Sequence, residues 1–239
     1  MIAIFEENTF EQFYPLTLNH ATFELRCHGA SMLDWIKSDN NSDDVILVVR
    51  DSIKNIVSAR YPDAIINPEN IPDNYQKIHL SENKYFKKDD NLFSFSGVDF
   101  KASYINSFKK GKPDQHQSCT MINEDCIFIS DSAKVSAGVI LDASNGPIII
   151  DDNALIDIGA LIKGPSYIGV NSIINPGAKL DCVDIGPDCK IGGEVEHTTF
   201  HGYSNKQHDG YLGNSYVGEW VNLGANTNNS DLKNNYSNI

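Results

Sequence analysis

The residues between Asn205 and Asn235 include the side chains in this chain that are best suited to chemistry. This segment holds His208, turns marked by glycine and a run of asparagine amides, spaced as in successive coils of a repeat. An imidazole with a reference pKa of about 6.5 can accept a proton near neutral pH. An isolated histidine is also compatible with a surface position that has no role. The meaning of His208 therefore depends on the elements that hold it.

An aliphatic residue recurs about every six positions in the stretch that leads into this segment. A period of six fits neither the roughly 3.6 residues of a helical turn nor the roughly two-residue alternation of a strand, and it is typical of repeated strand-and-turn units. Glycine beside several of these residues, as at Gly169 and Gly186, indicates tight corners. The recurring residues are Ile129, Val135, Leu141, Ile150, Ile156, Ile162, Ile168, Ile174, Leu180, Ile185, Ile191, Leu212, Val217 and Leu223.

This repeat predicts a parallel β-helix over residues 123–239. Three short strands form one triangular coil, and only stacked coils bury the aliphatic residues. The stretch from Ile127 to about Ser230 has room for roughly five or six coils, more than the about three that stability requires. A β-sandwich would instead alternate at period two, with turns about every 8–12 residues. The period itself does not give the hand of the helix.

Residues 193–236 carry a resemblance to a known family. They read GEVEHTTFHGYSNKQHDGYLGNSYVGEWVNLGANTNNSDLKNNY. This string is similar to left-handed β-helix acyltransferases, in particular to the C-terminal half of bifunctional N-acetylglucosamine-1-phosphate uridylyltransferase/glucosamine-1-phosphate acetyltransferases. It resembles still more closely a branch of sugar-nucleotidyltransferase proteins with the same domain order. The resemblance runs from about Ile148 onward and implies a left-handed helix, acetyl-CoA as donor, a sugar phosphate or nucleotide sugar as acceptor, and a homotrimer.

The resemblance also implies roles for single residues. It makes His208 the general base that takes a proton from the attacking amine or hydroxyl, Tyr211 a sugar-phosphate contact and Asn222 an amide facing the acceptor. Ala225 matches a backbone position near the acyl carbonyl of acetyl-CoA, and Lys206 could contact a phosphate. The alternatives are a packed Tyr211, an internal ladder containing Asn222 and a solvated Lys206.

Three departures from the family pattern bear on the acceptor and the donor. Asn175 and Glu196 stand where the amino-sugar enzymes place basic residues, and Asn226 replaces a glycine. The acceptor is therefore expected to differ from glucosamine-1-phosphate, or to bind differently. The family completes its acetyl-CoA groove with further coils, whereas this chain ends 31 residues after His208. We expect either a fragment or a loss of acyl transfer.

Residues 1–98 have a different pattern. Apolar and helical spacings alternate here, which predicts a small α/β layer with parallel strands. Residues 99–122 turn polar and are interpreted as a linker. The expected strands are Ile2–Phe5, Val45–Val49 and Ala64–Asn67, and the expected helices are Ala30–Lys37 and Asp51–Arg60.

Two segments of this region resemble nucleotidyltransferases, namely Pro15-Leu16-Thr17 and Glu24-Leu25-Arg26. The loop that should bind the phosphates, residues 6–11, has three carboxylates and no glycine. Glycine allows backbone N–H groups to approach a triphosphate, and carboxylates repel it. We therefore expect a degenerate domain kept for packing or sugar contact. Mg²⁺-dependent sugar-1-phosphate nucleotidyl transfer is the alternative.

Two other classes of function remain open for the helix. Trimeric β-helix carbonic anhydrases bind zinc through three histidines, and His197, His201 and His208 lie within 12 residues, although not at that family's spacing. We therefore expect no metal ligands among these residues. A non-catalytic trimerisation or binding scaffold is the second alternative, because the basic residues of the family site are missing.

Composition limits the partners and the cellular compartment that this chain can have. The net charge of −13 argues against nucleic acid as a partner, because phosphate binding requires clusters of Lys and Arg. No apolar run reaches the about 18 residues of a membrane span, and the N-terminus does not resemble a secretion signal. Five cysteines without a CxxC pair favour reduced thiols. These features predict a cytoplasmic protein without membrane insertion.

Overall fold

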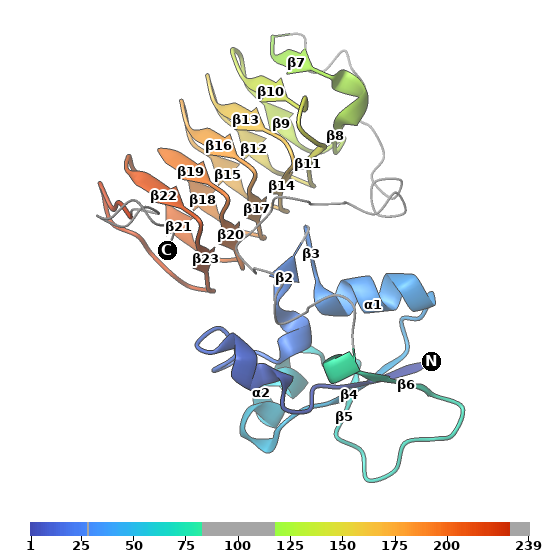
Figure 1. The fold of residues 1–239 in the computed structure, drawn as a ribbon. Coiled ribbons are helices and arrows are strands. Elements are labelled where there is room, and N and C mark those ends of the chain that lie inside the picture. The colour runs from blue at the N-terminus through green and yellow to red at the C-terminus, as the bar shows by residue number, and fades with distance from the viewer. Residues whose placement is uncertain (28, 83–117, 230–239) are drawn as a thin grey trace. The chain divides into compact units, whose positions relative to one another are not determined.

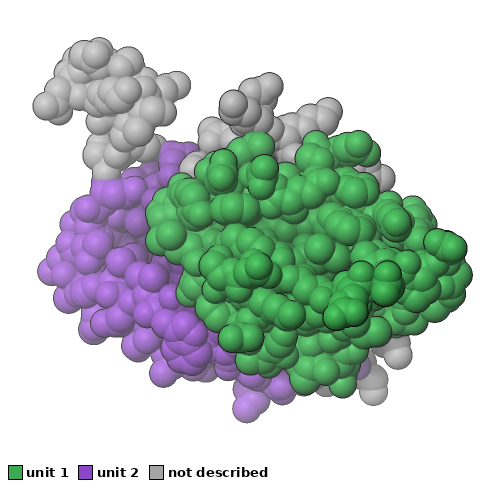
Figure 2. Space-filling view, turned by 90° about the horizontal axis from the view of Figure 1, so that it is seen from below, with its two compact units in different colours: residues 1–91 green, residues 92–239 purple. Residues whose placement is uncertain are grey.

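The chain forms two compact units, Met1–Asn91 and Leu92–Ile239 (Figure 2). The computed structural model describes residues 1–27, 29–82 and 118–229. Each unit has its own cluster of buried apolar side chains. Most of the expected linker, residues 99–117 of 99–122, lies outside the described residues. None of the helices in the described parts of the chain is both long and apolar enough to span a membrane.

Unit 1 contains a parallel four-stranded sheet. Its strands are β1 (Ile2–Phe5), β4 (Val45–Val48), β5 (Ile65–Ile66) and β6 (Gln76–His79), in the order β5-β4-β1-β6 (Figure 1). All three pairings are parallel. The α/β layer with parallel strands that the sequence predicts is therefore present.

Helix α1 (Met32–Asn40) connects β1 to β4 through a small hairpin of β2 (Arg26–Cys27) and β3 (Ala30–Ser31). Its start is fixed by a capping box, because the Ser31 hydroxyl accepts from the Asp34 N–H at 3.1 Å and the Asp34 carboxylate accepts from the Ser31 N–H at 3.0 Å. Its apolar residues Met32, Leu33, Trp35 and Ile36 are buried. The remaining helices of the unit are α2 (Lys54–Arg60) and the 3-10 turns η1 (Thr9–Phe13), η2 (Thr22–Glu24), η3 (Asp51–Ile53) and η4 (Leu80–Glu82).

Unit 2 is a parallel β-helix built from three sheets (Figure 1). The β22 sheet has the order β22-β19-β16-β13-β10-β7, the β23 sheet β23-β20-β17-β14-β11-β8, and the β21 sheet β21-β18-β15-β12-β9. Six, six and five strands agree with the five or six coils expected. Strand β7 lies within the segment interpreted as a linker, so the helix begins three residues earlier than predicted.

The strands of this helix are short because each coil turns after two or three residues. A 3-10 turn, η6 (Glu124–Cys126), lies in the first coil. The strands are β7 (Thr120–Ile122), β8 (Ile127–Ile129), β9 (Lys134–Val135), β10 (Ile140–Asp142), β11 (Ile148–Ile150), β12 (Leu155–Ile156), β13 (Leu161–Lys163), β14 (Ser166–Ile168), β15 (Ile173–Ile174), β16 (Lys179–Asp181), β17 (Asp184–Ile185), β18 (Lys190–Ile191), β19 (Glu194–Glu196), β20 (Thr199–Phe200), β21 (Asn205–Lys206), β22 (Tyr211–Gly213) and β23 (Tyr216–Val217).

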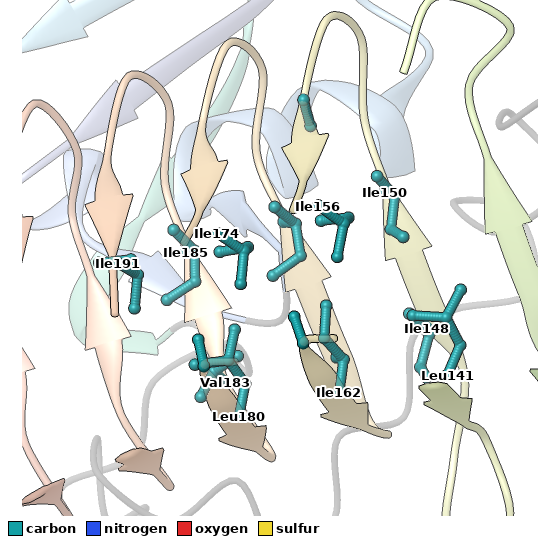
Figure 3. Close-up of a cluster of buried hydrophobic side chains, with 14 of the residues drawn as sticks. Leu141, Ile148, Ile150, Ile156, Ile162, Ile174, Leu180, Val183, Ile185 and Ile191 are labelled. Carbon is teal, nitrogen blue, oxygen red and sulfur yellow. The ribbon is translucent and has the colours of Figure 1, made fainter. Parts of the chain in front are cut away.

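The recurring aliphatic residues point into the helix and stack from coil to coil (Figure 3). In the β22 sheet, Leu141, Ile162 and Leu180 are in register. All fourteen residues of the predicted repeat belong to this core or pack against it. The period of six therefore identified the interior correctly.

The corners of the helix use two kinds of residue for two reasons. Gly169 and Gly186, expected at corners for their permissive backbone, are needed for space instead, because a Cβ at Gly169 would lie 2.7 Å from the Ile185 carbonyl oxygen of the next coil. Asparagine, aspartate and other glycines take the left-handed conformation, which they tolerate best. Along one edge of the helix, such turns contain Asn153, Asn171 and Asp188, and along another edge they contain Gly138, Gly159 and Gly177.

Candidate functional site

Strands β21 and β22 belong to the last coils of the helix (Figure 1). His208 is exposed and lies in the corner between them. Two side chains donate hydrogen bonds to the backbone carbonyls of this corner and hold it in place. The Lys206 ammonium donates to the His208 carbonyl at 3.1 Å and to the Gly210 carbonyl at 2.7 Å. The Asn175 amide donates to the Gln207 carbonyl at 2.9 Å. The imidazole is thus carried on a fixed backbone and remains accessible to solvent.

Lys206 itself lies inside the helix and is only 1% exposed. It continues the interior column of Ile174 and Ile191, and its third hydrogen bond goes to the Gly192 carbonyl at 2.9 Å. Burial lowers the pKa of its ammonium. Three donors are bonded to three carbonyls, so this geometry fits a structural role better than the phosphate contact expected from the resemblance. Its spacing of six residues before Leu212 is the sequence signal that places it inside.

Tyr211 begins β22 and lies beside a carboxylate. Its hydroxyl donates to Glu196 Oε2 at 3.4 Å. A Cβ at Gly213 would collide with the hydroxyl end of the Tyr211 side chain, so this glycine makes room for the phenol. The two features direct the tyrosine along the face of the β22 sheet toward Glu196.

The charged residues of this sheet near Tyr211 are mainly acidic. Register places Asp181 beside Glu196, and Lys179 beside Glu194. Lys163 is bonded to Asp181 at 3.0 Å, and this hydrogen bond raises the pKa of the lysine. Glu196, where the family pattern has a basic residue, therefore adds negative charge next to the tyrosine.

Asn222 and Ala225 lie on the segment that follows β23. Both residues are exposed, and Asn222 forms an isolated parallel bridge with Asn205. The Asn226 N–H donates to the Asp209 carbonyl at 2.9 Å, which places the turn that contains Ala225 beside the His208 corner. Asn226 has a φ of 56°, and asparagine is well tolerated there, so its replacement of the family glycine is compatible with the turn.

Two further asparagines, which the sequence analysis did not single out, cover the free edge of β22. Asn228 Oδ1 accepts from the Tyr211 N–H at 2.7 Å, and Asn229 Oδ1 accepts from the Gly213 N–H at 2.9 Å. The Asn229 amide also donates to the Gly213 carbonyl at 2.8 Å. Together with the Asn229 N–H, which donates to the Tyr211 carbonyl at 3.1 Å, these side chains take the place of a next strand and protect this edge.

The three histidines considered for zinc have different surroundings. His201 is buried, contacts the Tyr216 ring edge-on at 6.1 Å and lies 3.9 Å from a Glu219 carboxylate oxygen. His197 takes a left-handed conformation at a corner, with a φ of 44°. In the described part of one chain, these two and His208 do not come close enough together to share an ion.

In unit 1, the loop after β1 contains a buried ion pair. Glu6 is fully buried and accepts from Arg50 Nη1 at 2.5 Å and from the Thr22 N–H at 2.9 Å. Arg50 also donates to the Thr17 and His20 carbonyls, and its guanidinium lies 4.3 Å from the Phe10 ring centroid. The Arg50 guanidinium is therefore bonded within the protein, and it links Glu6 to the Thr17 carbonyl of the Pro15-Leu16-Thr17 segment.

Comparisons with known proteins agree with the resemblance found in the sequence. No family model matches the chain. It is 30% identical to the Bifunctional protein GlmU of Cyanothece sp. (strain PCC 7425 / ATCC 29141) over 130 residues, which cover 45% of this chain and 28% of that protein. The chain resembles GlmU.

Two other GlmU proteins match in the same way. The Bifunctional protein GlmU of Acaryochloris marina (strain MBIC 11017) is 30% identical over 129 residues, 45% of this chain and 28% of that protein. That of Gloeobacter violaceus (strain ATCC 29082 / PCC 7421) is 39% identical over 64 residues, 26% of this chain and 13% of that protein. The matches span less than a third of the length of these GlmU proteins.

Proposed function

We propose that this protein is a sugar-related acyltransferase that moves an acetyl group from acetyl-CoA to a nucleotide sugar or sugar phosphate. The observation that carries the proposal is the His208 corner, in a parallel β-helix that resembles GlmU. The imidazole is exposed, its backbone is fixed by the Lys206 ammonium, and the turn containing Ala225 lies beside it. A homotrimer is part of the proposal and rests on the resemblance.

The reaction requires a base, because an amine or hydroxyl must lose a proton as it adds to the thioester carbonyl. His208 takes this proton and passes it to the departing thiolate of coenzyme A. General base catalysis of this kind contributes about 10²–10⁴-fold to the rate. The backbone at Ala225 lies near the acyl carbonyl, and Asn222 faces the acceptor.

The acceptor contacts Tyr211 and Glu196 through hydroxyl groups, and its phosphate lies elsewhere. The carboxylate of Glu196 accepts hydrogen bonds and repels phosphate. Lys206 takes no part in acceptor binding, because its three donors are bonded to carbonyls inside the helix. This arrangement favours the hydroxyl-rich part of a nucleotide sugar over glucosamine-1-phosphate.

Unit 1, in this proposal, is a degenerate nucleotidyltransferase-like domain. The Arg50 guanidinium is bonded to Glu6 and to two backbone carbonyls. The next residue after Glu6 is Glu7, which adds a second carboxylate. Arg50 could bind a triphosphate only after its bonds to Glu6 and to the two carbonyls were broken. Added nucleoside triphosphate and Mg²⁺ should therefore produce no pyrophosphate with any sugar-1-phosphate.

The proposal is tested by acetyl-CoA binding in a calorimeter and then by thiol release with a panel of acceptors. His208→Ala should lower kcat by about 10²–10⁴-fold. Gln207→Ala changes an exposed side chain of the same corner and should leave kcat within twofold, as about 0.4 kcal/mol or less of barrier change would give. Turnover unchanged in His208→Ala excludes this residue as the base. Absence of acetyl-CoA binding favours the non-catalytic scaffold.

A further inference from the structure

The carboxyl ends of β1 and β6 form the place in unit 1 where a ligand is expected to bind. The chain runs outward from β1 to β4 and β5, and then returns to place β6 on the other side of β1. In open parallel sheets, ligands bind outside the strand ends at such a reversal of strand order. Glu7 and Asn8 follow β1, and Ser81 follows β6.

A pocket of about 380 Å³ lies at this position, and we name it the Glu7 pocket. This volume is within the range of about 300–1,000 Å³ that is usual for small-molecule sites. Carboxylate, amide and hydroxyl groups line it, and its described lining contains no lysine or arginine. The lining residues are Glu7, Asn8, Thr9, Gln12 and Ser81.

The Glu7 carboxylate is held in a fixed orientation. His79 Nδ1 lies 2.6 Å from its Oε1 atom, and the Ser81 hydroxyl donates to its Oε2 atom. The His79 ring is stacked on Phe5, with centroids 4.7 Å apart and planes 11° apart. Glu7 has a φ of 53°, an uncommon conformation for a residue with a side chain. Such backbone strain is often found at functional sites.

The carboxylate remains able to bind a ligand. The hydrogen bonds from Ser81 and then from His79 are the largest causes that lower the pKa of Glu7, so the group is ionised near neutral pH. A carboxylate has about four acceptor positions, and the bonds with His79 and Ser81 use one on each oxygen. Each oxygen can therefore accept one further hydrogen bond, and two adjacent acceptors match two neighbouring hydroxyls of a sugar ring.

The same features exclude a polyphosphate. Its charge would lie against the Glu7 carboxylate in a pocket whose described lining has no lysine or arginine, and Arg50 is already bonded to Glu6. The amides of Asn8 and Gln12 are uncharged donors and acceptors, which suit further hydroxyls. The Thr9 hydroxyl donates to the Glu6 carbonyl at 2.6 Å and contributes to the wall of the pocket.

We propose that the Glu7 pocket binds a neutral sugar, with the Glu7 carboxylate accepting hydrogen bonds from two adjacent hydroxyls. The site belongs to unit 1 and does not depend on acyl transfer by unit 2. Unit 1 thereby has a ligand of its own, although its phosphate loop is closed by the Glu6–Arg50 pair.

The test uses saturation-transfer difference NMR on the full chain, with methyl glucoside as the neutral probe and tripolyphosphate with Mg²⁺ as the anionic probe. Methyl glucoside should bind saturably, and Glu7→Gln should weaken it about tenfold or more, the usual effect of losing a hydrogen bond to a charged group. Glu69→Gln, an exposed carboxylate outside the pocket, should leave binding unchanged.

Two further variants keep the proposal open to refutation if Glu7→Gln alters the fold. Gln12→Ala changes an exposed residue of the lining and should weaken methyl glucoside several-fold. His208→Ala should leave it unchanged, which separates this pocket from the acyl site. Absence of saturable binding, equal binding in Gln12→Ala and wild type, or tighter binding of tripolyphosphate than of methyl glucoside would each overturn the proposal.

Discussion

Lys206 shows how one residue can join the interior of the helix to its surface chemistry. A buried ammonium is unfavourable unless its donors are bonded, and here all three carbonyl partners lie at or beside the His208 corner. The sequence predicted that Lys206, two residues before His208, either contacts a phosphate or is solvated, and both predictions place its ammonium outside the helix. The period of six residues was the better guide to its position.

Replacing Lys206 with methionine should destabilise the helix. The variant keeps a long side chain inside but leaves the His208 and Gly192 carbonyls without this donor, which costs about 1–3 kcal/mol. Urea denaturation measures the difference in the free energy of unfolding. Lys190→Met, on the exposed side of β18, is the matched control and should change stability by less than about 0.5 kcal/mol. Equal stability of the two variants would mean that the three bonds add nothing net.

Gly213→Ala should weaken acceptor binding without removing catalysis. The new methyl group would displace the Tyr211 hydroxyl from its position beside Glu196. Under the proposed function, the KM for the acceptor should rise about tenfold, the usual effect of one lost hydrogen bond, while acetyl-CoA affinity is unchanged. Gly218→Ala is the control, since a Cβ there meets nothing within 4 Å. An unchanged KM in Gly213→Ala would remove Tyr211 from the acceptor site.

At the scale of elements, the sequence predicted the repeats well and the edges poorly. The aliphatic period and the parallel strands of unit 1 follow from local patterns, and both are present. The use of Asn229 as an edge cap depends on register with β22, which no local pattern specifies. The Glu7 pocket was missed for the same reason, because Ser81 and His79 reach Glu7 only through the order of the sheet.

The edge cap predicts local fraying in Asn229→Ala. This change removes the acceptor for the Gly213 N–H and the donors to the Gly213 carbonyl and the Ser215 hydroxyl. We expect a loss of about 1–2 kcal/mol and faster hydrogen exchange at the Gly213 amide. Asn222→Ala alters an exposed side chain of the same segment and should leave this exchange rate unchanged. Equal protection of Gly213 in both variants would contradict the capping role.

At the scale of the whole molecule, both proposed sites avoid phosphate in similar ways. Each site has a carboxylate where the resembled family binds a phosphate group. These carboxylates are Glu7, by resemblance to nucleotidyltransferases, and Glu196, by resemblance to acetyltransferases. The net charge of −13 acts in the same direction. Under both proposals, these two carboxylates recognise hydroxyl groups, and any phosphate of a ligand lies away from them. The stability of the molecule also depends on buried groups that must stay neutral.

His20 is the clearest such group, and it predicts how stability falls in acid. Its Nδ1 lies 2.9 Å from Arg60 Nη1, and burial, followed by the charge of Arg60, lowers its pKa to about 4. In the unfolded chain this histidine has a pKa of about 6.5 and binds the proton first. Its protonation should therefore lower the free energy of unfolding by up to about 3 kcal/mol as the pH falls from 6.5 to 4.

His20→Asn tests this prediction, because it keeps an acceptor for Arg60 but cannot be protonated. The free energy of unfolding should then depend less on pH in this window. His197→Asn, which suits the left-handed corner, should retain the slope. The same slope in wild type and His20→Asn would show that His20 is protonated without cost.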